Sequence, residues 1–414
     1  MPPLPASAPV TVVFTAANRG ELRPCGCPGG VYGGLAKRAT LFQALEQEIG
    51  HFTLVDAGDT LFPDGPMADA VRRPREAKAL GVLRAYAAMG YAFIADTPSD
   101  RTRASAELRA TAEWASAFLP RREPAAGQSA NIVLLDSEAA KAPTTSGPVI
   151  ALTARSDADL AGVLAGAPDV WAVISSSPPP TLSDPAVSLV DGVPVLRPTP
   201  KGKEFGVLRI WEEGADVLPA EVTTISADKT LQLFHISAGH HRMDVEFRRV
   251  PRETADRPDV DAILTEAEAD AVRLDGADPS AEWEGQTYAS VGACVSCHEP
   301  QARRWQQTGH ARAWVMLQAT HDDQNLDCVA CHSTGYAQEG GFLRPQAVGM
   351  LSDVQCEVCH GPSVQHVYAP ENVLPPRRTP DASVCLGCHQ ADRSRPFVYA
   401  EWLPRVACPV VSVP

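Results

Sequence analysis

Residues 354–362 read VQCEVCHGP, and the pattern inside them decides how the last third of the chain folds. Two cysteines are separated by two residues and followed at once by a histidine. The same Cys-x-x-Cys-His pattern begins again at Cys294, Cys328 and Cys385, so it occurs four times. The four copies contain Cys294, Cys297, His298, Cys328, Cys331, His332, Cys356, Cys359, His360, Cys385, Cys388 and His389. Four copies this close together cannot plausibly arise by chance.

This spacing has a specific chemical meaning. Two thiols one helical turn apart reach the two vinyl groups of a haem and form thioethers, and the adjacent imidazole binds the iron as its proximal ligand. Paired cysteines can also form disulfides or zinc sites, but a histidine after every pair would give each zinc surplus ligands. The sequence therefore predicts four covalently bound haem c groups.

The composition of the last third agrees with this prediction. After Tyr288 the strand signals vanish, and Gly, Pro, Cys and His dominate. Such a segment cannot build a large core from side chains alone, so haems would supply the missing apolar mass. We expect residues 287–414 to form a mostly α, loop-rich tetrahaem cytochrome c domain.

Length and charge restrict what the whole chain does. Its 414 residues suffice for two domains, and its formal charge of −14 argues against nucleic acid as a partner. No stretch approaches the roughly 18 apolar residues that a membrane span needs. The start, MPPLPASAPV, has neither the basic nor the apolar region of a signal peptide. Because haem c is attached outside the cytoplasm, we expect a periplasmic or extracellular protein whose leader was removed or is missing from this sequence.

Each haem iron has a second axial position, and histidines outside the four motifs are candidates for it. His310 lies in WQQTGHARAW and His366 in CHGPSVQH, and both follow a motif closely. His321 precedes the second motif and is a weaker candidate. In LFHISAGHHRMDV, His240 and His241 either form part of a solvated turn or reach a haem from the front of the chain.

The front of the chain alternates short apolar runs with helical patterns, which predicts an α/β domain over residues 10–250. Residues 1–9 form a short tether, and residues 251–286 an acidic helix and linker. The expected strands are Val10–Ala16, Phe52–Ala57, Tyr91–Asp96, Asn131–Leu135 and Val170–Ser175, followed by antiparallel strands in VPVLRP and FGVLRIW. The expected helices are Leu35–Ile49, Arg75–Met89, Ala104–Phe118 and Asp259–Arg273.

The stretch from Tyr288 to His389 resembles the tetrahaem cytochrome c-554 family. The matching pieces are the first CxxCH with W-x-x-T-x-H-A after it, CHSTG, VQCEVCHGP and a last CxxCH. The resemblance implies that His366 caps the haem of His298 and that His310 caps the haem of His360. It also implies that the haem of His332 is five-coordinate. The family places a histidine before its last motif, and this chain has none there, so the resemblance supplies no distal ligand for the haem of His389.

Residues 10–212 resemble the metallophosphatase half of the 5′-nucleotidase family, through GGLAKRAT (33–40), VDAGDT (55–60) and DGVPVLRPTPKGKEFGVLRI. The resemblance implies an α/β metallophosphatase-like sandwich. Those enzymes hold two metals with Asp and His, but the matching loops here read Ala17-Asn18-Arg19, Thr97-Pro98-Ser99-Asp100 and Ser175-Ser176-Ser177-Pro178. Only Asp59 matches a metal ligand. One aspartate cannot hold a two-metal centre, so we expect a pseudo-phosphatase.

Cys25 and Cys27 lie on the loop after the first strand, beside the lost metal site. A disulfide between them would be strained, so the pair either undergoes redox chemistry, binds a soft metal or is structural, with Cys408 as another partner. Nearby Arg19, Arg23, Lys37 and Arg38 would favour the thiolate.

Three hypotheses about function follow. The first is electron transfer between extracytoplasmic donor and acceptor proteins. The second is an enzyme, which either reduces a small nitrogen or sulfur species at a five-coordinate haem or performs thiol chemistry at Cys25 and Cys27. The third is a subunit of a haem filament, and thus an oligomer.

Overall fold

The computed structural model describes most of the chain and divides it into two compact units. Most of the first unit lies before Ala267 and most of the second after Glu268, and residues 66–74 also belong to the second. The described residues are 8–25, 32–63, 67, 69–118, 130–135, 147–167, 169–177, 186–212, 218–227, 231–239, 241–274, 287–320, 322–323, 325–336, 338–342, 351–389 and 397–409.

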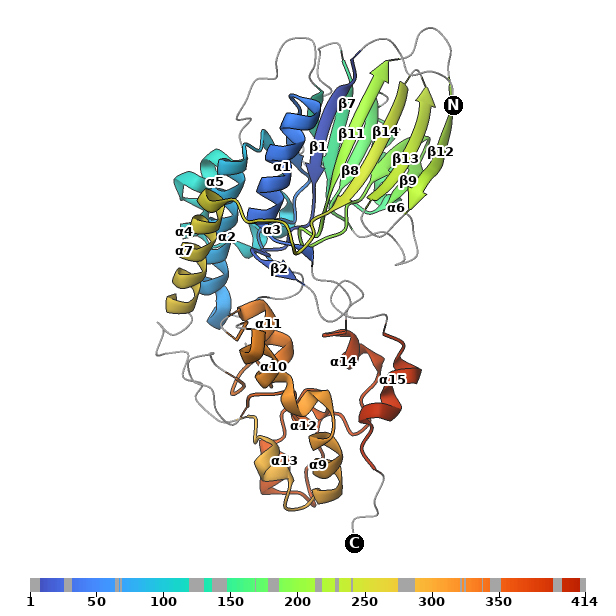
Figure 1. Cartoon of the computed structure of the whole chain (residues 1–414). Helices are drawn as coiled ribbons and strands as arrows, with labels where there is room; N and C mark the ends of the chain where they lie inside the picture. The colour runs from blue at the N-terminus through green and yellow to red at the C-terminus, as the bar shows by residue number, and fades with distance from the viewer. Residues whose placement is uncertain are drawn as a thin grey trace. The chain divides into compact units, whose positions relative to one another are not determined.

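The first unit contains a seven-stranded sheet with the order β12-β13-β14-β11-β1-β4-β5 (Figure 1). The strands β1, β4 and β5 run parallel, whereas β11 pairs antiparallel with β1 and continues into a meander with β14, β13 and β12. The bounds are β1 Val10–Thr15, β4 Thr53–Asp56, β5 Phe93–Ile94, β11 Glu204–Glu212, β12 Leu218–Ala227, β13 Leu231–Gly239 and β14 His241–Arg249.

A second, five-stranded sheet has the order β6-β7-β8-β10-β9 and packs face to face on the first. Its strands are β6 Asn131–Leu134, β7 Val149–Thr153, β8 Val170–Ser175, β9 Val187–Val190 and β10 Val193–Leu196. The core between the sheets combines Phe14 and Phe247 of the first sheet with Ile150, Ile174 and Leu196 of the second. Alternating apolar residues on both sheets thus face one shared interior. A small hairpin joins β2 (Pro24–Cys25) to β3 (Tyr32–Gly33).

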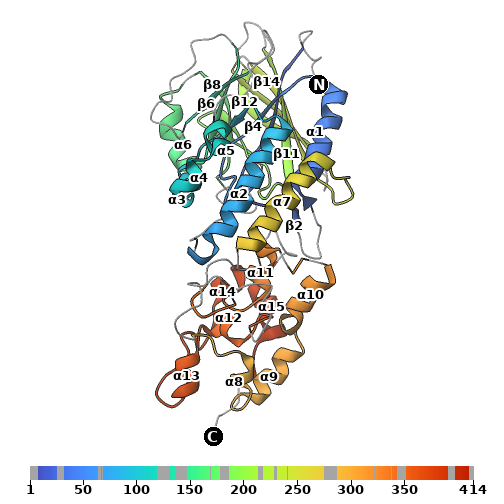
Figure 2. The ribbon, with the colours of Figure 1, turned by 90° about the vertical axis from the view of Figure 1, so that its left-hand side faces the viewer.

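Helices cover the outer faces of this sandwich (Figure 2). The helix α6 packs Leu160 and Leu164 on the five-stranded sheet, and α1 buries Phe42 against Phe205 of β11, with ring centroids 5.1 Å apart. The helices α2 and α7 lie side by side, because Gly81 has no Cβ that would meet Ala267. The bounds are α1 Leu35–Ile49, α2 Asp69–Met89, α3 Pro98–Arg103, α4 Ala106–Arg109, α5 Ala112–Ala117, α6 Asp157–Leu164 and α7 Pro258–Leu274.

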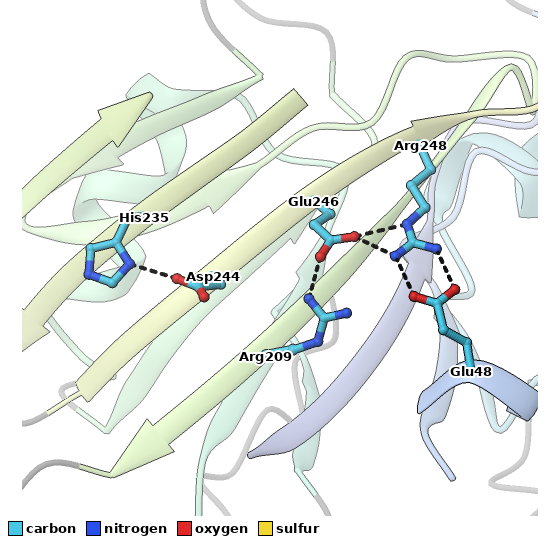
Figure 3. A network of polar contacts seen from close by, with 6 residues as sticks. All are labelled: Glu48, Arg209, His235, Asp244, Glu246 and Arg248. Atoms are coloured by element: carbon cyan, nitrogen blue, oxygen red, sulfur yellow. Dashed lines mark hydrogen bonds and ion pairs between the residues drawn. The ribbon is translucent and has the colours of Figure 1, made fainter. Parts of the chain in front are cut away.

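A network of charged side chains crosses the seven-stranded sheet outside the core (Figure 3). Glu246 of β14 accepts hydrogen bonds from Arg209 of β11 and Arg248 of β14, and Arg248 also pairs with Glu48 of α1 at 3.3 Å. The network therefore links a helix to two strands through exposed and half-buried ion pairs, which contribute little each to stability.

The expected α/β sandwich in the front and the mostly α, loop-rich end are both confirmed. Every expected strand and helix has a counterpart, except that residues 104–118 form two short helices, α4 and α5, separated near Thr111. Sequence reasoning missed β7 and did not predict the long meander from β12 to β14. The meander strands carry polar residues on one face, such as Glu246 and Arg248, which obscured their apolar alternation.

The second unit consists of short helices joined by loops (Figure 1). They are α8 Val291–Cys294, α9 Glu299–Gln306, η2 Gly309–Arg312, α10 Ala313–Thr320, α11 Leu326–His332, α12 Cys356–His360, α13 Val364–Tyr368, α14 Ala382–Leu386 and α15 Tyr399–Val406. Among the described residues of this unit, the β-pairing consists of one antiparallel bridge between Ser333 and Ser352. In the part of the chain that the structure describes, no helix is long and apolar enough to cross a membrane.

Candidate haem-binding site and the remnant of a metal site

Each of the four motifs is built on a helical turn. The motif of Cys356 is the helix α12 itself, and that of Cys328 forms the end of α11. The motifs of Cys294 and Cys385 begin in the last residues of α8 and α14 and continue beyond them. The amides of His298 and His389 donate to the carbonyls of Cys294 and Cys385, both at 2.9 Å. One helical turn thus brings the two thiols and the histidine of a motif to one side.

Cys294, Cys297, Cys356, Cys359 and Cys385 form no disulfide in the structure. The disulfide alternative therefore has no support among them. Burial raises the pKa of Cys359 to about 11, so this thiol is held in its neutral form. Pairs of cysteines on helical turns, each pair followed by a histidine, fit the attachment chemistry of haem c.

Three of the candidate axial histidines are oriented by backbone carbonyls. Nδ1 of His332 lies 2.7 Å from the carbonyl oxygen of Ala313. Nδ1 of His360 lies 2.8 Å from the carbonyl oxygen of Arg377, and Nδ1 of His366 lies 2.6 Å from that of Val373. A carbonyl oxygen only accepts, so Nδ1 carries the proton and Nε2 keeps its lone pair. This is the arrangement that metal-binding histidines use, because the second hydrogen bond fixes the ring and its tautomer.

Two pairs of imidazole rings have the centroid separation that two axial ligands of one iron would have. The ring centroids of His298 and His366 are 6.3 Å apart, and those of His310 and His389 are 6.1 Å apart. Two axial imidazoles on one metal place their centroids about 6 Å apart, since each metal–nitrogen bond is about 2 Å long. Burial also lowers the pKa of His310 and of His389, which favours the neutral form that binds metal.

The second pair differs from the pairing that the family resemblance implies. That resemblance assigns His310 to the haem of His360, whereas the structure places His310 beside His389. The carbonyl of His310 accepts from the amide of Val354, just before α12, at 3.1 Å, and its ring lies 6.1 Å from that of His389 between centroids. Spacing along the chain identifies a candidate ligand, but helix packing decides which motif it faces.

His332 and His360 have no such partner among the described residues, since no other histidine ring lies against either of them there. Two of the candidates, His321 and His240, lie outside the described residues. Ring contacts among the described residues therefore assign no distal histidine to the haems that His332 and His360 would bind.

The first and third motifs are joined by a buried carboxylate that the sequence analysis did not single out. Glu357, inside the third motif, is 2% exposed and accepts from the amides of Ala289, Ser290 and Ser363 at 2.8 to 3.0 Å. The neighbouring Cys356 thiol lowers the pKa of Cys294. The first and third motifs thus lie next to each other.

The second unit exposes large apolar side chains where the first buries them. Among the described residues, ten of the twelve exposed large hydrophobic side chains belong to it. They are Val295, Val315, Met316, Val367, Tyr368, Val373, Leu374, Leu386, Val398 and Leu403. Exposed apolar surface on this scale marks a place where something apolar binds. Together with the thiols and imidazoles, it shows that the residues present fit haem c.

In the first unit, the one aspartate that matches a metal ligand is bound by hydroxyl groups. Asp59 accepts from Thr97 at 3.0 Å and from Ser176 at 2.8 Å, and these residues stand on the loops where metal ligands are expected. Among the described residues, no group of three His, Cys, Asp or Glu side chains could hold a metal ion. Ala17, Arg19 and Asp59 keep left-handed backbone, a conformation that costs energy and clusters at functional sites.

A neighbouring carboxylate in the same loops is buried. Asp100 accepts from the amides of Thr60 at 2.8 Å and Leu61 at 3.1 Å. Burial, together with the charges of Asp59 and Asp56, raises its pKa to about 7, although the two amides oppose the shift. Asp100 thus closes the β4 loop onto α3.

The basic residues expected to favour a thiolate at Cys25 have other partners. Arg23 forms an ion pair with Asp261, Lys37 binds Asp256 at 3.2 Å, and the buried Arg38 donates to Tyr86 at 2.9 Å. Cys25 ends β2, and Cys27 lies outside the described residues. These basic side chains thus join neighbouring segments of the first unit: Arg23 binds α7, and Arg38 links α1 to α2.

The histidines at the end of the front unit also have partners there. His241 begins β14, and its ring stacks on Trp171 at 3.1 Å between centroids. His235 hydrogen-bonds Asp244 on the neighbouring strand at 2.6 Å (Figure 3). Within the second unit, the histidine ring beside His389 is that of His310.

The second unit has the features of a multihaem c-type cytochrome: repeated attachment motifs on helical turns, paired imidazoles and exposed apolar side chains. Residues 293–361 match the family model described as cytochrome c554 and c-prime. The region is also 38% identical over 84 residues to cytochrome c-554 of Nitrosomonas europaea, over 17% of this chain and 36% of that protein. The chain thus spans about a third of the length of the curated relative it matches. The resemblance of the C-terminal region to this family is therefore confirmed.

Solved structures similar to this chain include phosphoesterases and a nucleotidase. They include a calcineurin-like phosphoesterase from Bacillus subtilis, at 12% identity and a TM-score of 0.40 over 64% of this chain and 99% of that one. A 5′-nucleotidase precursor from Thermus thermophilus gives 15% identity and a TM-score of 0.39 over 68% and 61%. These TM-scores are low, so the fold of the first unit is defined by its own strand order and core.

Proposed function

We propose that residues 287–414 bind four haem c groups and carry electrons between extracytoplasmic donor and acceptor proteins. The observation that carries this proposal is the pairing of imidazoles from different helices beside helical Cys-x-x-Cys-His turns, at 6.3 and 6.1 Å between centroids. Bound haem c supplies a one-electron couple, and the protein tunes it through axial ligands, hydrogen bonds and burial. The periplasmic or extracellular location belongs to the same proposal, since haem c is attached outside the cytoplasm.

In this proposal the eight motif cysteines attach the haems, and the motif histidines are the proximal ligands. His366 is the distal ligand opposite His298, and His310 is the distal ligand opposite His389. The carbonyl of Val373 holds the ring of His366, and burial keeps His310 neutral. Both distal ligands thus come from elements outside the motifs that they complete.

Intact mass and spin-state measurements test these assignments. The full-length protein should carry four haems that survive acid–acetone extraction. His310→Ala and His366→Ala should each convert one low-spin haem to high-spin while all four haems stay attached, because attachment depends on the cysteines. Fewer than four haems would contradict the stoichiometry, and an unchanged spin-state count in either variant would contradict that ligand.

We further propose that the first unit does not hydrolyse phosphate esters. Support comes from Asp59, whose two carboxylate oxygens accept from Thr97 and Ser176 rather than from a shared metal ligand set. Two metal ions are what polarise phosphate and generate hydroxide in such enzymes. Assays with p-nitrophenyl phosphate and nucleotides, with added manganese or zinc, should give background rates. Metal-dependent turnover that Asp59→Ala abolishes would overturn this proposal.

A second candidate function is reduction of a small nitrogen or sulfur species at the haem of His332. The resemblance to the cytochrome c-554 family implies a five-coordinate haem at His332, and among the described residues no histidine ring faces His332, whose own ring the carbonyl of Ala313 orients. An open axial site binds small ligands. Addition of nitrite, sulfite or NO to the oxidised protein should then shift a high-spin EPR signal. An all-low-spin spectrum that none of the three changes would exclude this function.

A further inference from the structure

The last described segment, residues 397–409, runs along three of the four motifs, and we call it the C-terminal strap. It contains α15 and lies beyond the residues that match the cytochrome family model. At its start, Phe397 stacks on the ring of His389, with centroids 4.6 Å apart and planes 13° apart. Trp402 lies beside both rings, 6.0 Å from Phe397 and 6.3 Å from His389 between centroids. Two aromatic rings therefore wall one face of a proximal imidazole.

The strap is fixed to the rest of the second unit by hydrogen bonds at both ends. Tyr399 donates to the carbonyl of Pro380, just before α14, at 3.0 Å. Arg304 of α9 donates to the carbonyls of Pro404 and Arg405 at 3.0 and 2.9 Å. These contacts hold the aromatic pair against the helix turn that carries His389.

Further contacts strengthen this placement. The guanidinium of Arg405 lies 4.6 Å over the ring of Trp402, which restricts the indole. Gln301 donates to the carbonyl of Pro409 at 3.3 Å, so the strap stays on α9 to its end. Burial, followed by the neighbouring thiols Cys385 and Cys408, raises the pKa of Cys359, so Cys408 lies near the third motif. The strap is thus a built element with partners along its length.

Among the described residues, no backbone carbonyl accepts from Nδ1 of His389, whereas His332, His360 and His366 each have such a partner. Ring stacking is what restrains His389 instead. A flat aromatic ring at 4.6 Å limits rotation of the imidazole about the bond it would make to iron and keeps water from its face. The same restraint could not come from a flexible aliphatic side chain.

We propose that Phe397, supported by Trp402, is a positioning residue for the fourth haem: it sets the rotation of the His389 ring and shields it from water. This rests on the proposed haem function and goes beyond it. The apolar surroundings of a haem disfavour the ferric form, which carries the extra positive charge, so the shield raises the reduction potential of this haem. The rings of His389 and His310 make an angle of 49°, against 29° for His298 and His366, so the two bis-histidine haems should give distinguishable EPR signals.

The test uses the full-length haem-loaded protein and four variants. Phe397→Leu and Trp402→Leu remove the aromatic wall, Phe397→Tyr keeps the ring, and Val398→Ala changes the neighbouring, 47% exposed position as a matched control. Haem content by mass, a potentiometric titration and the EPR spectrum of the oxidised protein are recorded for each.

We expect Phe397→Leu to keep four haems, to lower the potential of one of them and to move one low-spin EPR signal, with a smaller change for Trp402→Leu. Phe397→Tyr should restore both readouts, and Val398→Ala should change neither. The signal of the His298 haem is the internal reference. Unchanged potentials and EPR signals in Phe397→Leu would overturn the proposal, as would equal changes at all haems. Loss of haem from the wild-type protein would instead contradict the proposed function itself.

Discussion

The two units of this chain place their apolar residues in opposite ways. In the first unit, two sheets enclose a core in which Phe14, Phe247, Ile150 and Ile174 are fully buried. In the second, short helices leave Tyr368 80% exposed and Leu374 65% exposed. The first unit satisfies its hydrophobic residues with its own side chains, which is what a sandwich of two sheets allows.

The second unit lacks that means of stabilisation. Its helices have eight residues or fewer, and helices this short are marginal unless something packs against them. Four haems would cover the exposed apolar side chains and tie the helices together through thioethers. The comparison therefore suggests that one unit folds from its sequence and the other folds on its cofactors.

The sharpest way to break this comparison is to block haem attachment. In chain produced without haem attachment, we expect residues 287–414 to be digested rapidly by protease, while the first unit survives as a resistant fragment. The physical reason is that the apolar residues of the second unit then have no partner. Limited proteolysis with mass spectrometry, using the haem-loaded protein as control, measures this. A haem-free second unit as resistant as the loaded one would show that its fold does not depend on the cofactor.

A core substitution in the first unit should act in the opposite way. Phe247 is buried between the sheets and packs edge-on against Phe14 and Phe234, with centroids 5.8 and 5.9 Å away. Phe247→Ala should destabilise the first unit by about 3–5 kcal/mol through lost burial and the cavity left behind. Denaturant unfolding followed by far-UV circular dichroism measures the loss, and the haem spectrum serves as the control. Altered haem spin states in this variant would show that the two units are not independent in stability.

The smallest of the three effects concerns pH. The pKa of Asp100 is raised to about 7 in the folded protein by burial, so between pH 4 and 7 the folded state holds a proton that the unfolded state has released. The contribution of Asp100 is therefore full at low pH and is lost as the pH rises through 7, by on the order of 1 kcal/mol per pH unit.

Unfolding of the first unit at pH 5.5 and at pH 7 should show this loss. Asp100→Asn, which does not titrate, removes that component of the pH dependence, whatever its constant effect on stability. An identical pH dependence in the two proteins would contradict the raised pKa. The haem spectrum of both proteins should stay the same across this range.

Sequence reasoning worked best where chemistry demands a fixed local spacing. The four Cys-x-x-Cys-His turns, the apolar strand runs of β1, β4 and β8, and the start of α7 at Pro258 are all set by neighbours in the chain. Sequence reasoning was weaker in the meander of β12 to β14, where polar residues on one face of the strands interrupt the apolar alternation. It also overlooked Glu357, because a carboxylate inside a motif carries no signal until the amides of Ala289, Ser290 and Ser363 are brought to it.

The sequence by itself therefore showed the four Cys-x-x-Cys-His motifs, and it named His310 and His366 as candidate distal ligands. It also showed that only Asp59 matches a ligand of the two-metal site that its resemblance to the 5′-nucleotidase family implies. Only the tertiary structure decided that His310 faces His389, that Thr97 and Ser176 bind Asp59, and that Phe397 stacks on a proximal imidazole. The physical reason is that a thioether motif lies within one helical turn, whereas axial pairing and ring stacking depend on how distant segments pack.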